Sequence, residues 1–409
     1  MRSSDVVGLA RFGGDALGRS GSVIGEVHRA VSGRVFGALG LLGLPVRLMH
    51  DGITTVAYGG VRGALRLVPR VAAAPVARAL PPAGHAMADS PLGSLALAAL
   101  NGAWGDSLAT AHPDLAVELT VRRAGRAVTT DSAGLASAFP DAGPRVAVFV
   151  HGLCETEGGW RLGSAPSYGS RLREDLGYTA IYVRYNTGLH VSDNGRRLSE
   201  VLEAVVKAWP VDVEEIVLVG HSMGGLVARS ACHYGEAGGA AWTGRVRHVF
   251  CLGTPHLGAP LERAANLAGW ALTRLPETRP FGDLVNARSA GIKDLRFGSC
   301  VEDDWCDCDP DEFMRDRCTE VPFLTCATYY FVGATLSRRS DDALAVVGDL
   351  LVTFPSASGN GRQRRIPFEI DHGRHVGGLT HFGLLNHPAV YEQIRTWLGQ
   401  EAPAELTAA

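Results

Sequence analysis

Residues 215–229 read EIVLVGHSMGGLVAR, an apolar run that passes through closely spaced glycines into a second apolar run. β-branched residues dominate 216–219, which predicts a buried strand. The residues after Ser222 are compatible with a helix. Only glycine fits the positions that flank so tight a connection, here Gly220 and Gly224. The stretch therefore predicts a strand, a sharp turn and a helix in direct succession.

Ser222 lies at the centre of this turn, in the motif Gly-His-Ser-Met-Gly. A G-x-S-x-G turn between a strand and a helix is a nucleophile elbow, which holds the serine hydroxyl above the sheet and beside the helix N-terminus. The flanking strand and helix distinguish the motif from a chance pentapeptide. The alternative interpretation is a glycine-rich turn without chemistry. The context favours a nucleophile.

A serine hydroxyl is a weak nucleophile at neutral pH, so it needs a base and an acid that orients the base. In chains with this elbow the order is Ser, then Asp or Glu, then His. Asp349 lies in the apolar run 346–352, where a carboxylate is costly without a partner. We expect Asp349 to be the acid, with Asp342 and Asp371 as alternatives.

His381 precedes the expected C-terminal helix, 389–398, and is the expected base. His387 adjoins Pro388 and is expected to shape the start of that helix. When the serine attacks a carbonyl group, the carbonyl oxygen becomes negatively charged, and this oxyanion needs amide N–H donors. The N–H groups of Met223, directly after the nucleophile, and of Leu153, directly after an early strand, are expected to supply them.

From residue 144 onward, strand and helix patterns alternate, which predicts a mostly parallel central sheet with helices on both faces. Besides the elbow strand, the expected strands are 145–150, 178–185, 246–252 and 328–332. The stretch between the last two is too long for an ordinary connection. Its first part, 261–275, has apolar residues at helical spacing. We expect a lid over the site there, the alternative being a plain surface helix.

These motifs together resemble the α/β-hydrolase superfamily and, within it, bacterial lipases and lipase-like hydrolases related to the GPI inositol-deacylase family. The resemblance covers residues 144–398 and rests on HGL at 151–153, GHSMG at 220–224, GTPHLG at 253–258, DLLV at 349–352 and HFGLL at 381–385. It implies an α/β-hydrolase fold with a lid-like insertion, and a catalytic triad of Ser222, Asp349 and His381.

The resemblance also implies carboxylic esters with a lipid-like acyl chain as substrates. Motif residues beside the triad are expected to bind the substrate: His151, Gly152, His221 and Leu257. Of these, His151 is expected to support its loop rather than to react. Many such lipases have glycine directly after the acidic residue, where this chain has Leu350.

We expect the chain to begin with an Arg-rich apolar helical segment, residues 1–85, followed by a lead-in of a helix and edge strands, residues 86–143. An α/β-hydrolase catalytic domain should follow over residues 144–400, with a lid or insertion at about 259–326. Residues 401–409 are expected to form a tail. In the first part, Arg62, Arg66 and Arg70 predict a cationic stripe on a helix that Pro69 kinks or ends. Such a segment suits an anionic membrane surface. The alternatives are packing against the catalytic domain and a partly disordered leader.

The segment 300–312, CVEDDWCDCDPDE, together with Cys318 and Cys326, combines thiols and carboxylates. Disulfides, a bound cation or a solvated acidic loop would each account for it. Cys306 and Cys308 are one residue apart and no second close pair follows. This spacing matches no zinc pattern, so no metal is expected.

The 409 residues carry a formal charge of −3, which does not predict a nucleic-acid partner. The first residues lack a basic cluster followed by an apolar core and a cleavage site, so no secretory signal peptide is expected. The apolar run 35–46 is too short to span a bilayer. We expect a cytoplasmic protein, with peripheral membrane contact through the N-terminal segment as one interpretation.

The sequence thus predicts a serine carboxylic-ester hydrolase, a lipase or esterase that acts through an acyl-enzyme on a lipid or small ester and requires no cofactor. An acyltransferase would use the same triad and is one alternative. A catalytically silent, membrane-associated binding module is the other.

Overall fold

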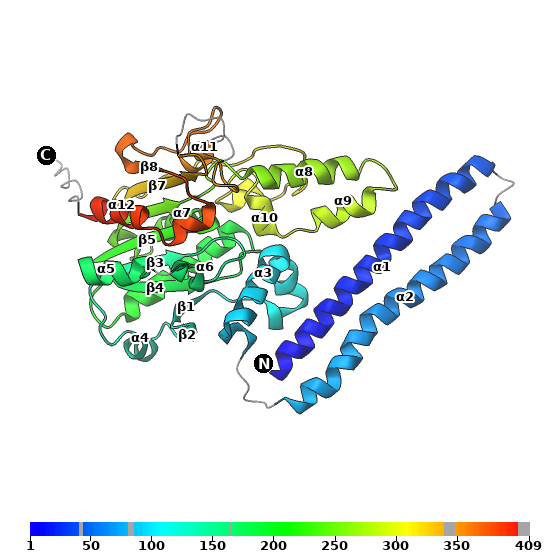
Figure 1. Cartoon of the computed structure of the whole chain (residues 1–409), viewed down its shortest axis with the longest axis horizontal. Helices are drawn as coiled ribbons and strands as arrows, with labels where there is room; N and C mark the ends of the chain where they lie inside the picture. The colour runs from blue at the N-terminus through cyan, green and yellow to red at the C-terminus, as the bar shows by residue number, and fades with distance from the viewer. Residues whose placement is uncertain (41–43, 81–85, 164, 339–347, 400–409) are drawn as a thin grey trace.

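The structure is a computed structural model and describes residues 1–40, 44–80, 86–163, 165–338 and 348–399. Its centre is an eight-stranded sheet in the order β2-β1-β4-β3-β5-β6-β7-β8 (Figure 1). Neighbouring strands from β4 to β8 are parallel, whereas β1 pairs antiparallel with β2 and with β4. The fold is therefore the α/β-hydrolase fold that the sequence predicts.

The strands agree with the sequence pattern wherever apolar residues are dense. Their bounds are Thr120–Arg123 (β1), Arg126–Val128 (β2), Arg145–Val150 (β3), Thr179–Arg184 (β4), Glu215–His221 (β5), Val246–Leu252 (β6), Thr328–Thr335 (β7) and Gly373–Gly377 (β8). The edge strand β8, GRHVG, was not predicted. Its glycine-rich sequence carries no strand pattern, and Gly373 instead leaves room for the ring of Phe331 on β7.

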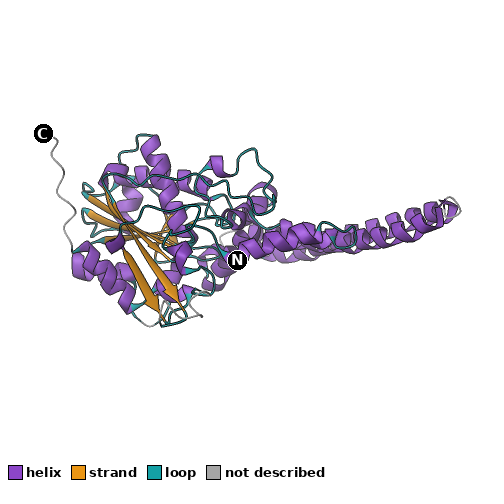
Figure 2. Cartoon of the chain, turned by 90° about the horizontal axis from the view of Figure 1, so that it is seen from above, coloured by secondary structure: helices purple, strands orange, loops and turns teal. Residues whose placement is uncertain are grey.

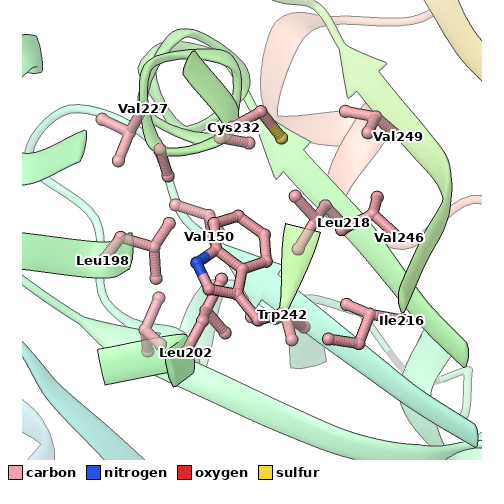
Figure 3. Close-up of a cluster of buried hydrophobic side chains, with 14 of the residues drawn as sticks. Val150, Leu198, Leu202, Ile216, Leu218, Val227, Cys232, Trp242, Val246 and Val249 are labelled. Carbon is pink, nitrogen blue, oxygen red and sulfur yellow. The ribbon is translucent and has the colours of Figure 1, made fainter. Parts of the chain in front are cut away.

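Alternate residues of the central strands face two separate cores. On one face Val146 and Val148 pack with α6 and α7, and on the other Ala147 and Phe149 pack with α5 and α12. Figure 3 shows part of the first core, where the buried indole of Trp242 lies among Val150, Leu198, Leu202 and Leu218. Helices on both faces hold the sheet rigid, and so fix the carboxyl ends of β3 and β5.

The helices of the α/β-hydrolase part and its lead-in are α3 (Pro91–Ala111), α4 (Ser132–Ala138), α5 (Tyr168–Leu176), α6 (Val191–Ala208), α7 (Met223–Ala237), α8 (Pro260–Leu272), α9 (Arg279–Asn286), α10 (Ala290–Asp294), α11 (Phe354–Ala357) and α12 (Pro388–Leu398). The expected C-terminal helix corresponds to α12, and His387 caps it by accepting a hydrogen bond from the N–H of Ala389. The insertion between β6 and β7 contains α8, α9 and α10.

The N-terminal helices α1 (Ser3–Leu39) and α2 (Leu44–Ala79) pack against each other as a long antiparallel hairpin that projects from the rest of the molecule (Figures 1 and 2). The prediction that Pro69 ends the helix is wrong, because α2 continues through Pro69 and Pro75. A kink at Pro69 stays a prediction. Packing along α1 offsets the hydrogen bonds that the two prolines remove. The expected segment end at residue 85 and the tail 401–409 lie outside the described residues.

The base of the hairpin is fixed to the lead-in helix α3. The Phe12 ring lies 5.8 Å from that of Trp104, and Leu9 joins the same apolar cluster. The carboxylate of Asp5 accepts a hydrogen bond of 2.9 Å from the N–H of Met87. Beyond this base the hairpin extends away from the sheet. None of the described helices combines the length and apolar character needed to cross a bilayer.

The Cys-rich and acidic segment is folded around its own carboxylates. Asp304 is buried and accepts hydrogen bonds from the N–H groups of Cys300 and Thr319. Glu312 pairs with Arg315 and Arg317. All eight cysteines are free thiols, and the described residues contain no group of three or more His, Cys, Asp or Glu side chains that could hold a metal ion. Internal hydrogen bonds and ion pairs therefore hold Asp304 and Glu312, whereas Asp303, Asp307 and Asp309 are exposed to solvent.

Candidate active site

The turn at Ser222 brings β5 directly into α7. Ser222 has φ 53° and ψ −124°, a backbone conformation that side-chain-bearing residues rarely adopt. A Cβ atom on Gly220 would lie 2.5 Å from the Cα of Gly225, and one on Gly224 would lie 2.2 Å from the carbonyl oxygen of Val150. The backbone segments thus lie too close together at both positions for any residue with a side chain. The geometry is that of a nucleophile elbow.

His381 and Asp349 form a buried pair. The Nδ1 atom of His381 lies 2.7 Å from Oδ2 of Asp349, and the carbonyl oxygen of Asp349 accepts the N–H of His381. The other carboxylate oxygen accepts the N–H groups of Leu351 and Val352, at 3.0 and 2.8 Å. Because the carboxylate accepts the proton on Nδ1, Nε2 is the ring nitrogen left to act as a base.

Ser222 and His381 line one cavity of about 310 Å³. Most of its wall is apolar and includes Leu153, Leu261, Ala265, Ile292, Leu295 and Val352. Asp349 lies behind His381, nearly fully buried. The structure thus brings the Ser222 hydroxyl, the His381 imidazole and an apolar cavity together at the carboxyl edge of the sheet, where ligands of open α/β sheets bind.

The two expected oxyanion donors lie beside the nucleophile. Leu153 follows β3 and lines the cavity, and Met223 is the first residue of α7. Within the described part of the chain, neither backbone N–H has a hydrogen-bond partner. First-turn N–H groups of a helix are free to bind an anion, so Met223 is suited to that task.

The motif residues expected to bind substrate lie around the cavity instead of in its wall. His151 is fully buried, stacks on the Tyr185 ring at 4.5 Å and contacts the Gly152 carbonyl, and burial lowers its pKa. His221 is also fully buried. Leu257 lines a separate cavity, whose wall contains neither Ser222 nor His381. The structure gives these residues supporting positions.

Glu155 is a site residue that the sequence analysis missed. It lines the cavity, and its carboxylate accepts the N–H of Gly152 at 2.8 Å and lies 2.9 Å from Nδ1 of His221. Nε2 of His221 in turn contacts the carbonyl oxygen of His381 at 3.1 Å. Glu155 thereby joins the loop after β3, the elbow and the base. In sequence it is one of two glutamates in CETEGG, and no local pattern distinguishes it from a solvent-exposed residue.

Glu155 and His221 stabilise each other's charged forms. Burial lowers the pKa of His221, but the facing carboxylate and the hydrogen bonds outweigh burial and raise it above its ordinary value of 6.5. Burial raises the pKa of Glu155, but His221 and the hydrogen bonds outweigh it and lower the pKa below 4.5. Both shifts favour the charged forms of this buried pair, which lies beside Ser222.

The turn that carries Asp349 contains a strained residue. Leu350 has φ 87°, in the region that favours glycine, and its side chain is 60% exposed. Glycine would adopt this backbone conformation without strain. Of the alternative acids, Asp371 is exposed in the short helix Ile370–His372, and Asp342 lies outside the described residues.

A buried ionic cluster anchors α8 over the cavity. Glu262 on α8 pairs with Arg288 at 2.6 Å and with Arg296 at 3.0 Å, and all three side chains are nearly fully buried. Leu261 and Ala265 of the same helix line the cavity. The first helix of the insertion therefore forms part of the cavity wall, and its action as a lid stays a prediction.

Comparison with protein families finds that residues 145–306 match the model of the PGAP1-like alpha/beta domain. The match includes Ser222 and ends before Asp349 and His381. A comparison with curated proteins returned no relative. The sheet topology is that of the α/β-hydrolase fold, and the part of the chain that matches the PGAP1-like alpha/beta domain contains its central strands β3, β4, β5 and β6.

Solved structures with a similar fold include the mature lipase BlEst2 of Bacillus licheniformis, at 22% identity and a TM-score of 0.42, over 63% of this chain and 93% of that one. An alpha/beta hydrolase superfamily protein from Enterococcus faecalis matches at 14% identity and 0.39, over 64% and 93%. Homoserine o-acetyltransferase from Staphylococcus aureus matches at 13% and 0.35, over 64% and 87%.

Replacing Leu350 by glycine is expected to stabilise the protein. Relief of the positive φ outweighs the added entropy of the unfolded chain, for a net gain of about 0.5–1 kcal/mol in the free energy of unfolding. Leu162→Gly is the matched control, because Leu162 is similarly exposed but has φ −62°. Urea unfolding should show a gain for the first variant and a loss for the second. Equal losses would contradict the strain assigned to Leu350.

Glu155→Gln is expected to make stability less dependent on pH. The raised pKa of His221 means that its contribution is full below pH 6.5 and is lost as the pH rises through the folded-state pKa. The lowered pKa of Glu155 means that its contribution is present above pH 4.5 and is lost as the pH falls through the folded-state pKa. The Glu155–His221 pair therefore stabilises the folded protein most between pH 4.5 and pH 6.5.

Thermal unfolding of the wild type and of Glu155→Gln, measured at a series of pH values, checks this prediction. The difference in Tm should be largest at pH 5–6 and should shrink toward pH 9. A difference that stays constant over this range would mean that no ion pair forms.

Proposed function

We propose that the protein is a serine carboxylic-ester hydrolase that acts on lipid-like esters through an acyl-enzyme intermediate. The observation that carries the proposal is the shared cavity of Ser222 and His381, in which the imidazole is oriented by the buried carboxylate of Asp349. The fold alone would not support a reaction, because α/β-hydrolase folds host several chemistries. The arrangement of these three side chains supports nucleophilic acyl transfer.

In the proposed mechanism, Nε2 of His381 takes the proton of Ser222 as its Oγ attacks the ester carbonyl carbon. The negative charge moves to the carbonyl oxygen, where the N–H groups of Leu153 and Met223 stabilise it. His381 then gives the proton to the alcohol as the ester bond breaks. Water repeats the sequence on the acyl-enzyme and releases the acid. Asp349 keeps His381 in the productive tautomer throughout.

The wall of the cavity supports an apolar acyl group as the part of the substrate that is bound there. Its aliphatic side chains come from α8, α10, the loop after β3 and the turn after Asp349. Burial of methylene groups in such a chamber contributes about 0.8 kcal/mol each. Longer acyl chains should therefore bind more tightly until the chamber is filled.

Ser222→Ala is expected to lower the hydrolysis of p-nitrophenyl butyrate at least about 1,000-fold, because the nucleophile is lost. Asp349→Asn is expected to lower it by about the same factor, because the base is then held in the wrong tautomer. A fluorophosphonate probe should label the wild type and not Ser222→Ala. Unchanged hydrolysis in Ser222→Ala, or labelling elsewhere in the folded protein, would refute the proposal. Ester formation exceeding free acid in aqueous buffer with an added alcohol would indicate an acyltransferase.

Ala265→Trp is expected to shorten the acyl chains that the enzyme accepts, because Ala265 lines the cavity. The kcat/KM for p-nitrophenyl decanoate should fall at least about 10-fold more than that for p-nitrophenyl acetate, since lost apolar burial affects only the longer chain. Ala264→Trp is the matched control, because Ala264 is its exposed neighbour on α8. Equal effects of the two variants would exclude this cavity as the acyl site.

A further inference from the structure

The hairpin exposes an apolar stripe along the whole length of α2. Its members follow one another at steps of three or four residues, with one step of eleven, so they lie on one side of the helix. Each is 56–76% exposed: Val46, Met49, Ile53, Val56, Leu67 and Val71. Among the described residues of α2 only Ala77 is buried. Helices of water-soluble proteins normally turn such a stripe toward a core.

Polar groups and glycines fill the space between the two helices. Tyr58 and Arg66 of α2 lie against Gly25 and Gly18 of α1, where no side chain intervenes. The Tyr58 hydroxyl contacts Nδ1 of His28 at 2.8 Å. Arg66 and Arg70 pair with Asp15 at 3.7 and 2.9 Å. The contacts between the helices are therefore made by polar groups, glycines and Leu65, which packs on Gly21, whereas most of the aliphatic side chains of α2 point outward.

The first helix adds to the same kind of surface. Leu17, Ile24, Val31 and Val35 follow one another at helical spacing on α1 and are all exposed. We call these four side chains and the α2 stripe the apolar surface of the hairpin. Exposed apolar surface of this extent on an elongated element marks an interaction site.

The charge of the hairpin indicates what covers this surface. Residues 1–80 hold ten arginines against four acidic residues, a formal charge of +6, and since the whole chain carries −3 the remainder carries −9. Arg29 and Arg62 have no ion-pair partner among the described residues, and they line a groove of about 220 Å³ between the helices. Two hairpins of charge +6 repel each other, whereas an anionic phospholipid surface attracts them.

The hairpin is also tied to the insertion that covers the active site. Arg34 of α1 pairs with Glu277 at 2.5 Å, in the connection between α8 and α9. Leu275, Phe281 and Leu284 around that connection are exposed as well. A surface that binds the hairpin would therefore also lie near the cover of the cavity.

We propose that the N-terminal hairpin docks the protein onto the surface of an anionic phospholipid bilayer. Its apolar surface enters the boundary between headgroups and acyl chains, and its arginines lie at the phosphates. Docking is a binding event and does not depend on the proposed esterase chemistry.

Cosedimentation of the full-length protein with vesicles tests this proposal. Vesicles of phosphatidylcholine with 30% phosphatidylglycerol should bind the protein at least about 10-fold more tightly than phosphatidylcholine alone, because several arginines contribute. Ile53→Asp/Leu67→Asp should weaken binding to the anionic vesicles at least about 10-fold, since two buried apolar contacts are lost and two negative charges are added. Arg29→Gln/Arg62→Gln should reduce the preference for anionic lipid, because two of the ten arginines lose their charge.

Leu162→Asp/Ile370→Asp is the matched control, because it changes two exposed aliphatic residues outside the hairpin and should leave binding unchanged. Hydrolysis of soluble p-nitrophenyl butyrate and sedimentation velocity report folding and oligomeric state. The proposal is overturned if the wild type binds neither kind of vesicle. It is also overturned if Ile53→Asp/Leu67→Asp converts a stable dimer to a monomer without changing lipid binding, because a second copy then covers the apolar surface.

Discussion

The contact of α7 with the ends of β3 and β5 is the constraint on which the site depends. Gly220 and Gly224 allow backbone to meet backbone at distances that exclude any side chain. That approach forces Ser222 into a conformation with positive φ and aims the first N–H groups of α7 at the same space. The positions of the Ser222 side chain and of the Met223 N–H therefore follow from one local feature, which lies between the two cores of the sheet.

Two buried acid–histidine pairs meet at this turn. Asp349 orients His381 directly, and Glu155 holds His221, whose ring contacts the His381 carbonyl. In the proposed mechanism the first pair supplies the base. The second links the loop after β3 to the elbow and to His381, so a displacement of one of these segments changes the hydrogen bonds of the others. A buried carboxylate needs a polar partner, and the partners of Asp349 and Glu155 are two histidines of the site, His381 and His221.

The sequence predicts the core well because its signals are local. Dense β-branched runs identify β3, β5 and β6, and the G-x-S-x-G turn identifies the elbow. Glu155 could not be found in this way, because its role depends on His221, which is distant in sequence. The continuation of α2 through Pro69 depends on packing against α1. The edge strand β8 depends on pairing with β7, and Leu350 reveals its strain only through its backbone conformation.

The proposed site is tested most directly by a crystal structure of the protein after reaction with a fluorophosphonate ester. We predict phosphorus bonded to Oγ of Ser222, with the phosphonyl oxygen about 3 Å from the N–H groups of Leu153 and Met223. The acyl-like chain of the inhibitor should lie in the cavity beside Ala265. An adduct on another residue, or a phosphonyl oxygen turned away from both N–H groups, would contradict the assignment of this site.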